Sequence, residues 1–204
     1  ASKRSDFFAI ANGRSVCYDI NVRRHWLHQA GDFCCRKVLQ MTEEKTLTSV
    51  EQAEQAARAY FKQGLNCSEC VLAAFFDVHG TTLPREAIKL CTGFGGGMGL
   101  TQNNCGAVAG AVMALSTVVG REDPFAKESM EDRICELHED IYPKVYALIK
   151  NIEAEYGTLI CRELCEPFGH FECKERKKNC MKLIGRCAAL AEQHALIADK
   201  EKAQ

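Results

Sequence analysis

The chain has 204 residues and a formal net charge of −1, from 26 basic and 27 acidic residues. This balance provides no basic field for nucleic acid or anionic lipid, and no apolar run reaches the length of a bilayer-spanning helix. The length allows one sizeable core with a small appendage.

Cysteine is the unusual component, with 13 residues. Cysteine-dense secreted domains usually carry disulfides. Here the odd number leaves one thiol unpaired, the chain is larger than the usual stapled scaffold, and most cysteines fall in helical patterns. We therefore favour metal ligation in a reducing compartment over a disulfide framework. The cytoplasm is the expected location, with the periplasm as the alternative if a signal peptide was removed before Ala1.

The first part of the chain differs from the rest, because residues 1–45 show weak periodicity and hold the only tryptophan. That segment contains Cys17, Cys34 and Cys35. We interpret it as an N-terminal extension, followed by a main domain over residues 46–198 and a polar tail over residues 199–204. The roles of the extension and of its cysteines stay open.

Two helices are predicted at the start of the domain. Ser49 with Gln52 matches a capping box, apolar residues then recur at helical spacing, and Gly64 ends the pattern. Asn66 can cap a second helix that runs to about His79.

The middle of the domain combines a glycine-rich segment with a very apolar one. A short helix is predicted over residues 85–90, followed by a glycine-rich loop over residues 93–99. Asn103 or Asn104 then caps a helix over residues 105–119, which is almost wholly apolar. A helix that is apolar all round is expected to be buried, so this one is predicted to be the central helix.

Three further helices complete the prediction. Residues 126–150 have a long amphipathic pattern that Pro143 should kink. A short helix over residues 158–165 is expected to end at Pro167, and a last helix covers about residues 175–198. No strand pattern is convincing. The predicted fold is an all-α, compact helical bundle with a glycine-rich loop preceding a buried central helix.

Several cysteines are placed where helix geometry brings thiols together. Cys67 and Cys70 are three residues apart and share a helix face, as do Cys161 and Cys165, which are four apart. Cys105 falls at the first turn of the buried helix, where free N–H groups stabilise a thiolate. Three others are interpreted as small core residues, namely Cys91, Cys135 and Cys187.

The glycine-rich loop before Cys105 has two interpretations that the sequence leaves open. Glycines permit positive φ and let the backbone approach a bulky group closely. Their amides can also donate hydrogen bonds to the sulfur atoms of a cluster, which tunes its potential. The alternative is a plain tight turn.

A set of motifs in order resembles a known family. The matching segments are Asn66-Cys67, the loop at 93–99, Cys105-Gly106-Ala107-Val108-Ala109-Gly110, Cys161-Arg162-Glu163-Leu164 and Asn179-Cys180. Together they resemble the C-GCAxxG-C-C family of redox-active proteins over roughly residues 50–195. Any one segment alone is a weak signal, whereas the ordered combination is specific.

The resemblance implies a metal site. The four characteristic cysteines of the family fall on Cys67, Cys105, Cys161 and Cys180, which are therefore the expected metal ligands. The glycines assigned to cofactor binding are Gly95, Gly96, Gly97 and Gly106. Four thiolates are what an iron–sulfur cluster requires.

The same domain occurs in split-Soret cytochromes, which are dimers with c-type haems and a 2Fe–2S centre, so the resemblance implies a 2Fe–2S cluster and a homodimer. A 4Fe–4S cluster is the alternative, and Cys70 and Cys165 are the nearest substitute ligands.

The chain departs from those cytochromes at the haem motif. Covalent attachment of haem requires Cys-x-x-Cys-His, and the Cys-x-x-Cys at Cys67–Cys70 is followed by Val71. A c-type haem is therefore not expected. A haem bound non-covalently through His25 or His28 is an alternative to these histidines being simply solvated.

Three functions are compatible with these patterns. The first is an iron–sulfur protein for electron transfer or redox sensing. The second is a thiol–disulfide oxidoreductase that uses Cys67 and Cys70, although such a motif is expected near a βαβ unit and none is present. The third is a zinc-binding or metal-sequestering protein, because zinc also accepts four thiolates. No hydrolase constellation is found, so enzyme status stays open, and we favour an electron carrier with an unidentified redox partner protein.

Overall fold

The computed structural model describes residues 47–170 and 172–204. Leu47–Gln204 forms one compact unit. The predicted N-terminal extension, with its three cysteines and with His25 and His28, lies outside the described residues. Apart from one isolated bridge between Asn104 and Ile160, the regular structure of the described part is helical, which confirms the all-α prediction. No helix in this part has the length and apolar character needed to cross a membrane.

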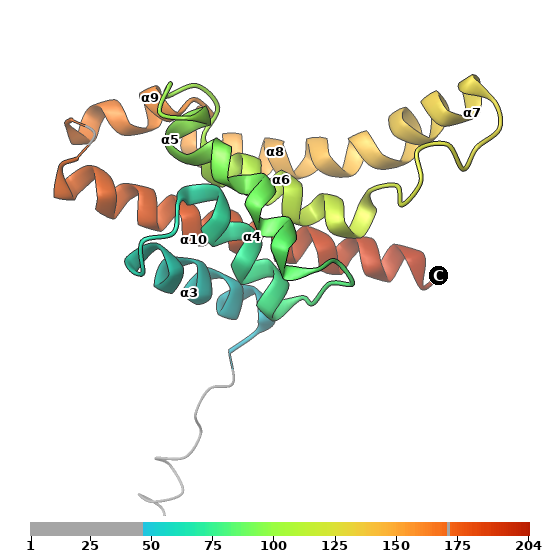
Figure 1. The fold of residues 1–204 in the computed structure, drawn as a ribbon, viewed down its shortest axis with the longest axis horizontal. Coiled ribbons are helices and arrows are strands. Elements are labelled where there is room, and N and C mark those ends of the chain that lie inside the picture. The colour runs from blue at the N-terminus through green and yellow to red at the C-terminus, as the bar shows by residue number, and fades with distance from the viewer. Residues whose placement is uncertain (1–46, 171) are drawn as a thin grey trace, which may run out of the picture. The chain divides into compact units, whose positions relative to one another are not determined.

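The helices, arranged as in Figure 1, pack around a core that is rich in alanine and cysteine. In chain order they are α3 (Ser49–Lys62), α4 (Cys67–Val78), the 3-10 helix η1 (Arg85–Phe94), the short α5 (Gly95–Met98), α6 (Gly106–Val119), α7 (Met130–Cys135), the π-helix η2 (Glu136–Ile141), α8 (Tyr142–Tyr156), α9 (Cys161–Cys165), the 3-10 helix η3 (Glu166–Phe168) and α10 (Lys174–Lys202). Helix α10 packs against α3, α4, α6 and α8, and α6 also packs against α4 and α8. The buried central helix is therefore confirmed, and α10 shares the centre with it.

The first two helices begin at side-chain caps. Thr48, rather than the predicted Ser49, caps α3, because Thr48 has the extended backbone of a cap and forms a capping box with Glu51. Asn66 caps α4 as predicted, since its side chain accepts the N–H of Glu69 at 3.1 Å. This cap fixes the start of α4 directly before its first residue.

The start of α6 differs from the prediction. Neither Asn103 nor Asn104 is the cap; Cys105 itself takes the extended cap conformation, with φ −62° and ψ 129°. The reason is that the chain before α6 pairs with the chain before α9. The Cys105 N–H donates to the Leu159 carbonyl at 2.9 Å, and the Cys161 N–H donates to the Asn103 carbonyl at 2.7 Å. This pairing brings the starts of α6 and α9 together.

The prolines act differently from what helix rules alone suggest. The predicted helix over residues 126–150 begins only at Met130, after a cap at Ser129. Pro143 lies in the first turn of α8, and the π-helical segment η2 precedes it, so a change of helix type accommodates the missing N–H. Pro167 lies inside η3 directly after α9 rather than beyond a terminated helix, because a first turn tolerates proline.

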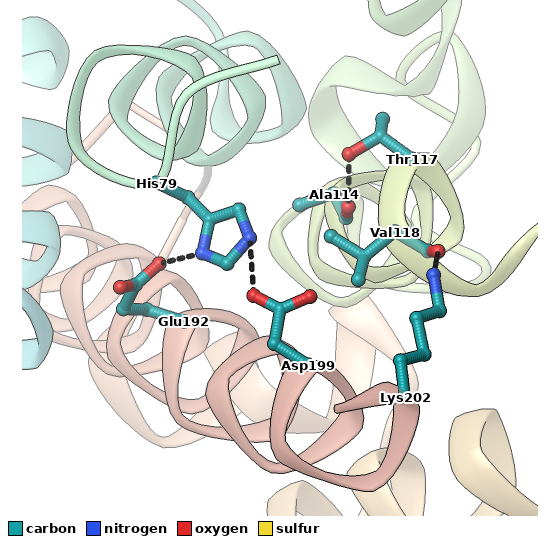
Figure 2. Close-up of polar contacts among 7 residues, drawn as sticks. All are labelled: His79, Ala114, Thr117, Val118, Glu192, Asp199 and Lys202. Carbon is teal, nitrogen blue, oxygen red and sulfur yellow. Dashed lines mark hydrogen bonds and ion pairs between the residues drawn. The ribbon is translucent and has the colours of Figure 1, made fainter. Parts of the chain in front are cut away.

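A polar cluster joins the C-terminal ends of α4 and α6 to α10 (Figure 2). His79 Nδ1 lies 3.0 Å from a Glu192 carboxylate oxygen, and His79 Nε2 lies 3.3 Å from Asp199 Oδ2. The Lys202 ammonium donates to the Val118 carbonyl near the end of α6. Glu192 is only 1% exposed, so its buried carboxylate requires the contact with this imidazole.

Candidate metal centre

A cavity of about 420 Å³ lies where α4, α6 and α9 begin, beside the first turns of α10. Figure 1 places α5 and α9 at the same end of the bundle as the start of α10. The residues that line the cavity include five cysteines, namely Cys67, Cys105, Cys161, Cys165 and Cys180. The structure thus brings together all of the cysteines predicted as ligands, and it adds Cys165, which the spacing in α9 had marked as a substitute.

Helix starts position most of these thiols. Cys67 and Cys161 are the first residues of α4 and α9, and Cys105 is the cap of α6. The N–H groups of a first helical turn have no partner within the helix and carry partial positive charge. Helix ends that converge in this way favour negative charge in the cavity, which suits thiolates and anionic groups.

The predicted glycines divide into two roles. Gly95 and Gly96 line the cavity, and the Gly96 amide favours the Cys67 thiolate. Gly97 and Gly106 instead allow close packing. A Cβ on Gly97 would lie 2.7 Å from the Cys161 Cβ, and one on Gly106 would lie 2.5 Å from the Phe94 carbonyl oxygen. The loop is therefore a device for close approach around the cavity.

Three non-glycine residues in and after the loop also have the left-handed backbone conformation that glycine adopts most easily. Met98, Leu100 and Gln102 have φ of 62°, 68° and 59°. Such values are uncommon outside glycine and persist only where surrounding contacts impose them. The segment that leads from Gly96 into α6 is therefore held in a specific path, and that path delivers Cys105 to the cavity.

Burial keeps two of the thiols protonated in the absence of a metal. Burial raises the pKa of Cys105 to about 11, against the opposing effect of the Ala107 and Val108 amides. Burial likewise raises the pKa of Cys67, with the Gly96 amide opposing it. Neither is therefore a free thiolate nucleophile at neutral pH, because the thiolate is the reactive form. A metal would have to displace these protons as it bound.

The other side of the cavity combines three thiols with one cation. The Cys165 and Cys180 sulfur atoms are 3.7 Å apart, and Arg176 Nη2 lies 3.8 Å from the Cys161 sulfur. The thiols of Cys161 and Cys180 donate toward Cys165 and lower its pKa, and Arg176 adds to this effect. The pKa values of the two donating thiols rise in turn. One negative charge is thus favoured within the group, next to a guanidinium.

Arg176 is the site residue that sequence reasoning missed. It lies in the strongly charged run at the start of α10, which is typical of a solvated face, yet it is only 4% exposed. The spacing between Arg176 and the predicted ligand Cys180 could have indicated that Arg176 belongs to the site. Arg176 precedes Cys180 by four residues, so both share a face of α10 and both line the cavity.

The other five cysteines of the described part, among them Cys173 at the start of α10, do not line the cavity. Cys70 is fully buried and donates to the Leu65 carbonyl at 3.5 Å, while burial raises its pKa to about 12. Cys70 does not line the cavity, whereas Cys67, the first residue of α4, does. Cys91 and Cys187 are buried core residues, as predicted. The same prediction for Cys135 is wrong: it is exposed, because no residue of α7 is buried.

The cavity thiols do not form a ready site for one metal ion. Over residues 47–170 and 172–204, no group of three or more histidine, cysteine, aspartate or glutamate residues is arranged to hold a single metal ion. Donor groups surround the cavity from different elements instead.

Comparison with known proteins identifies one family. The model described as "Putative redox-active protein (C_GCAxxG_C_C)" matches residues 65–194, a span that contains every cysteine of the cavity together with Arg176. No curated protein and no solved structure matches the chain. The match covers more than half of the sequence.

Proposed function

Because this chain belongs to the C_GCAxxG_C_C family of redox-active proteins, we propose that it transfers electrons or senses redox conditions through an iron–sulfur cluster held in the cysteine cavity. The observation that carries the proposal is the convergence of cysteines from four separate helix segments on one cavity. A buried core needs no such convergence, because small thiols can be buried singly, as Cys91 and Cys187 are.

The proposed ligands are Cys67, Cys105, Cys161 and Cys180. Each comes from a different element, so the tertiary fold, rather than any local motif, sets their positions. Four thiolates match the ligand requirement of both 2Fe–2S and 4Fe–4S clusters, and we favour 2Fe–2S. When bound, the cluster would supply one-electron transfer, which thiols alone do not support.

The size of the cavity supports a cluster over a single zinc ion. Zinc bound to four thiolates needs metal–sulfur distances of about 2.3 Å, so all four sulfurs must surround one point. Within the described residues no group of three or more histidine, cysteine, aspartate or glutamate side chains is arranged to hold one ion, and the cysteines line a cavity of about 420 Å³. That space suits a group larger than one ion.

The charges around the cavity also suit an anionic cluster. Amides at the starts of α4 and α6 point partial positive charge toward it, and Arg176 adds a buried full charge beside Cys161. Amide donors near cluster sulfur and cations of this kind raise a reduction potential, because reduction adds negative charge. These residues would hold the cluster and adjust its potential.

The homodimer and the redox partner protein are parts of this proposal that rest on the family resemblance. Analytical ultracentrifugation of the loaded, full-length chain tests the dimer. A monomer at micromolar concentration would remove that part and leave the cluster unaffected.

The main experiment is anaerobic purification followed by iron and acid-labile sulfide analysis, visible absorption and electron paramagnetic resonance. We expect charge-transfer absorption, and the spectra will distinguish 2Fe–2S from 4Fe–4S. Cys105→Ala should lose both iron and sulfide. The matched control is Cys91→Ala, because Cys91 is equally buried but lies outside the cavity lining.

Two results would contradict the proposal. One is a colourless protein without iron or sulfide even after anaerobic reconstitution. The other is stoichiometric zinc that Cys105→Ala removes, which would support the zinc alternative instead.

A further inference from the structure

The cavity holds one cysteine more than a four-thiolate cluster uses. Cys165, the last residue of α9, is 4% exposed and its sulfur lies 3.7 Å from that of Cys180 in α10. Both side chains line the cavity, and Cys180 is the more exposed of the two. Two thiols in contact across separate helices form a pair that the cluster does not explain.

The backbone next to this pair is already held in place. The Asn179 side-chain amide donates to the Leu164 carbonyl at 3.1 Å, and these residues immediately precede Cys180 and Cys165. Helices α9 and α10 are therefore tied together one residue away from both thiols. A disulfide has an S–S bond of about 2.05 Å, so side-chain rotation over a short distance is the change that it requires.

We propose that Cys165 and Cys180 form a reversible disulfide when the cavity holds no cluster. The oxidant would be a small-molecule disulfide, RSSR. One cysteine of the pair attacks a sulfur of RSSR as its thiolate, the S–S bond breaks, and the leaving RS⁻ takes up the proton that this cysteine lost, giving RSH. The other cysteine then attacks the mixed disulfide at the first cysteine's sulfur, and the second leaving RS⁻ takes up its proton, giving a second RSH. The two cysteines are oxidised to one disulfide, and RSSR is reduced to two RSH.

Helix geometry disfavours the competing pair. Cys161 and Cys165 are also neighbours, but they lie four residues apart on α9. Side chains at this spacing have Cβ atoms about 5–6 Å apart, whereas a disulfide requires about 3.5–4.5 Å. Bridging them would distort the helix, so the pair that spans α9 and α10 forms in preference.

The pair has a consequence for the cluster, and this part rests on the proposed function. Cys180 cannot be a cluster ligand and a disulfide partner at the same time. Oxidation of the cluster-free chain would therefore lock the cavity against reloading until a thiol reduces the bond. The disulfide itself requires only the two cysteines.

The test uses the full-length, cluster-free chain incubated with oxidised glutathione, followed by non-reducing digestion and mass spectrometry. We expect a Cys165–Cys180 cross-linked peptide as the dominant species, which dithiothreitol removes. Cys165→Ala should abolish that peptide, and Cys91→Ala should leave it unchanged. Wild-type protein alone decides the question if Cys165→Ala fails to fold. A dominant Cys161–Cys165 link, or the absence of any link to Cys180, would overturn the proposal.

A second measurement separates this proposal from the first. Iron-loaded protein treated in the same way should yield at least tenfold less cross-linked peptide than the cluster-free chain. If the protein takes up a cluster but never cross-links, the disulfide proposal is wrong and the cluster proposal stands. If the chain cross-links but never takes up iron and sulfide, the cluster proposal is wrong and the disulfide proposal stands.

Discussion

The two ends of the central helices use charge in opposite ways. Helices α4 and α6 begin at the cysteine cavity and end beside the His79 cluster, so the cavity meets N–H groups and the cluster meets carbonyl groups. The cavity end accordingly holds thiols that become anionic ligands. The other end holds an imidazole and the Lys202 ammonium, which donates to the carbonyl of Val118. Helix polarity thus favours thiolates at the cavity end and hydrogen-bond donors at the other end.

The ends also differ in what their polar groups face. His79 contacts a carboxylate at each ring nitrogen, and the partners come from one helix, α10. Around the cavity, cysteine side chains from four helix segments face a common space. We conclude that the His79 cluster holds the bundle together and that the cavity is built to receive a ligand.

Gly106→Ala should have the largest effect on cluster loading, because the added methyl group would collide with backbone at the edge of the cavity. The new Cβ would lie 2.5 Å from the Phe94 carbonyl oxygen and 3.2 Å from the Cys67 Cβ, so backbone must move. We expect iron and sulfide content to fall more than tenfold while circular dichroism still shows a helical protein. Gly93→Ala is the control, since nothing lies within 4 Å of that Cβ. Equal loading of both variants would mean that the close approach has no function.

His79→Ala acts on the opposite end. It would leave the buried Glu192 carboxylate without its imidazole partner. Removing one partner of a buried pair lowers the free energy of unfolding by about 3 kcal/mol. Urea denaturation measures this change. His194→Ala should lower it by less than about 1 kcal/mol, because His194 contacts Asn151 at an exposed position. If the two variants lost the same stability, the structural role of the His79 cluster would be refuted.

Arg176→Met tests the charge at the cavity without removing a ligand. Loss of a buried cation should lower the reduction potential by about 60 mV, equivalent to a tenfold change in a one-electron equilibrium constant. Lys177→Met is the matched control. Lys177 also lines the cavity, but it is half exposed and paired with Glu172 at 2.7 Å, so water screens its charge. Equal shifts in a spectroelectrochemical titration would remove the special role of Arg176.

Glu155→Gln should have the smallest effect on stability, because this carboxylate lies neither at the cavity nor in the His79 cluster. A hydrogen bond from Arg186 lowers the pKa of Glu155, and about a third of each side chain is exposed. A lowered pKa stabilises the fold above the unfolded-state value and loses that effect as the pH falls. The substitution should cost less than about 1 kcal/mol at pH 7, and the difference should shrink as the pH falls below about 4.3, the ordinary pKa of glutamate. A difference that persisted in acid would point to packing instead.

Local patterns predicted much of the fold. Helical periodicity, the cap at Asn66 and the wholly apolar run after Cys105 are properties of neighbouring residues, so the helices and the buried centre followed from them. The caps of α3 and α6 were misplaced for different reasons. Thr48 competes with Ser49 by a single residue, and Cys105 is fixed by pairing with a segment more than fifty residues away.

The sequence by itself determined which elements form and, through the ordered motifs, which cysteines are candidate ligands. Tertiary structure decided what those side chains face. It buried Arg176 within a charged run, exposed Cys135, which had been interpreted as a core residue, and set Cys165 against Cys180. Helix periodicity specifies a face but not what covers it, because that depends on contacts between residues distant in the chain.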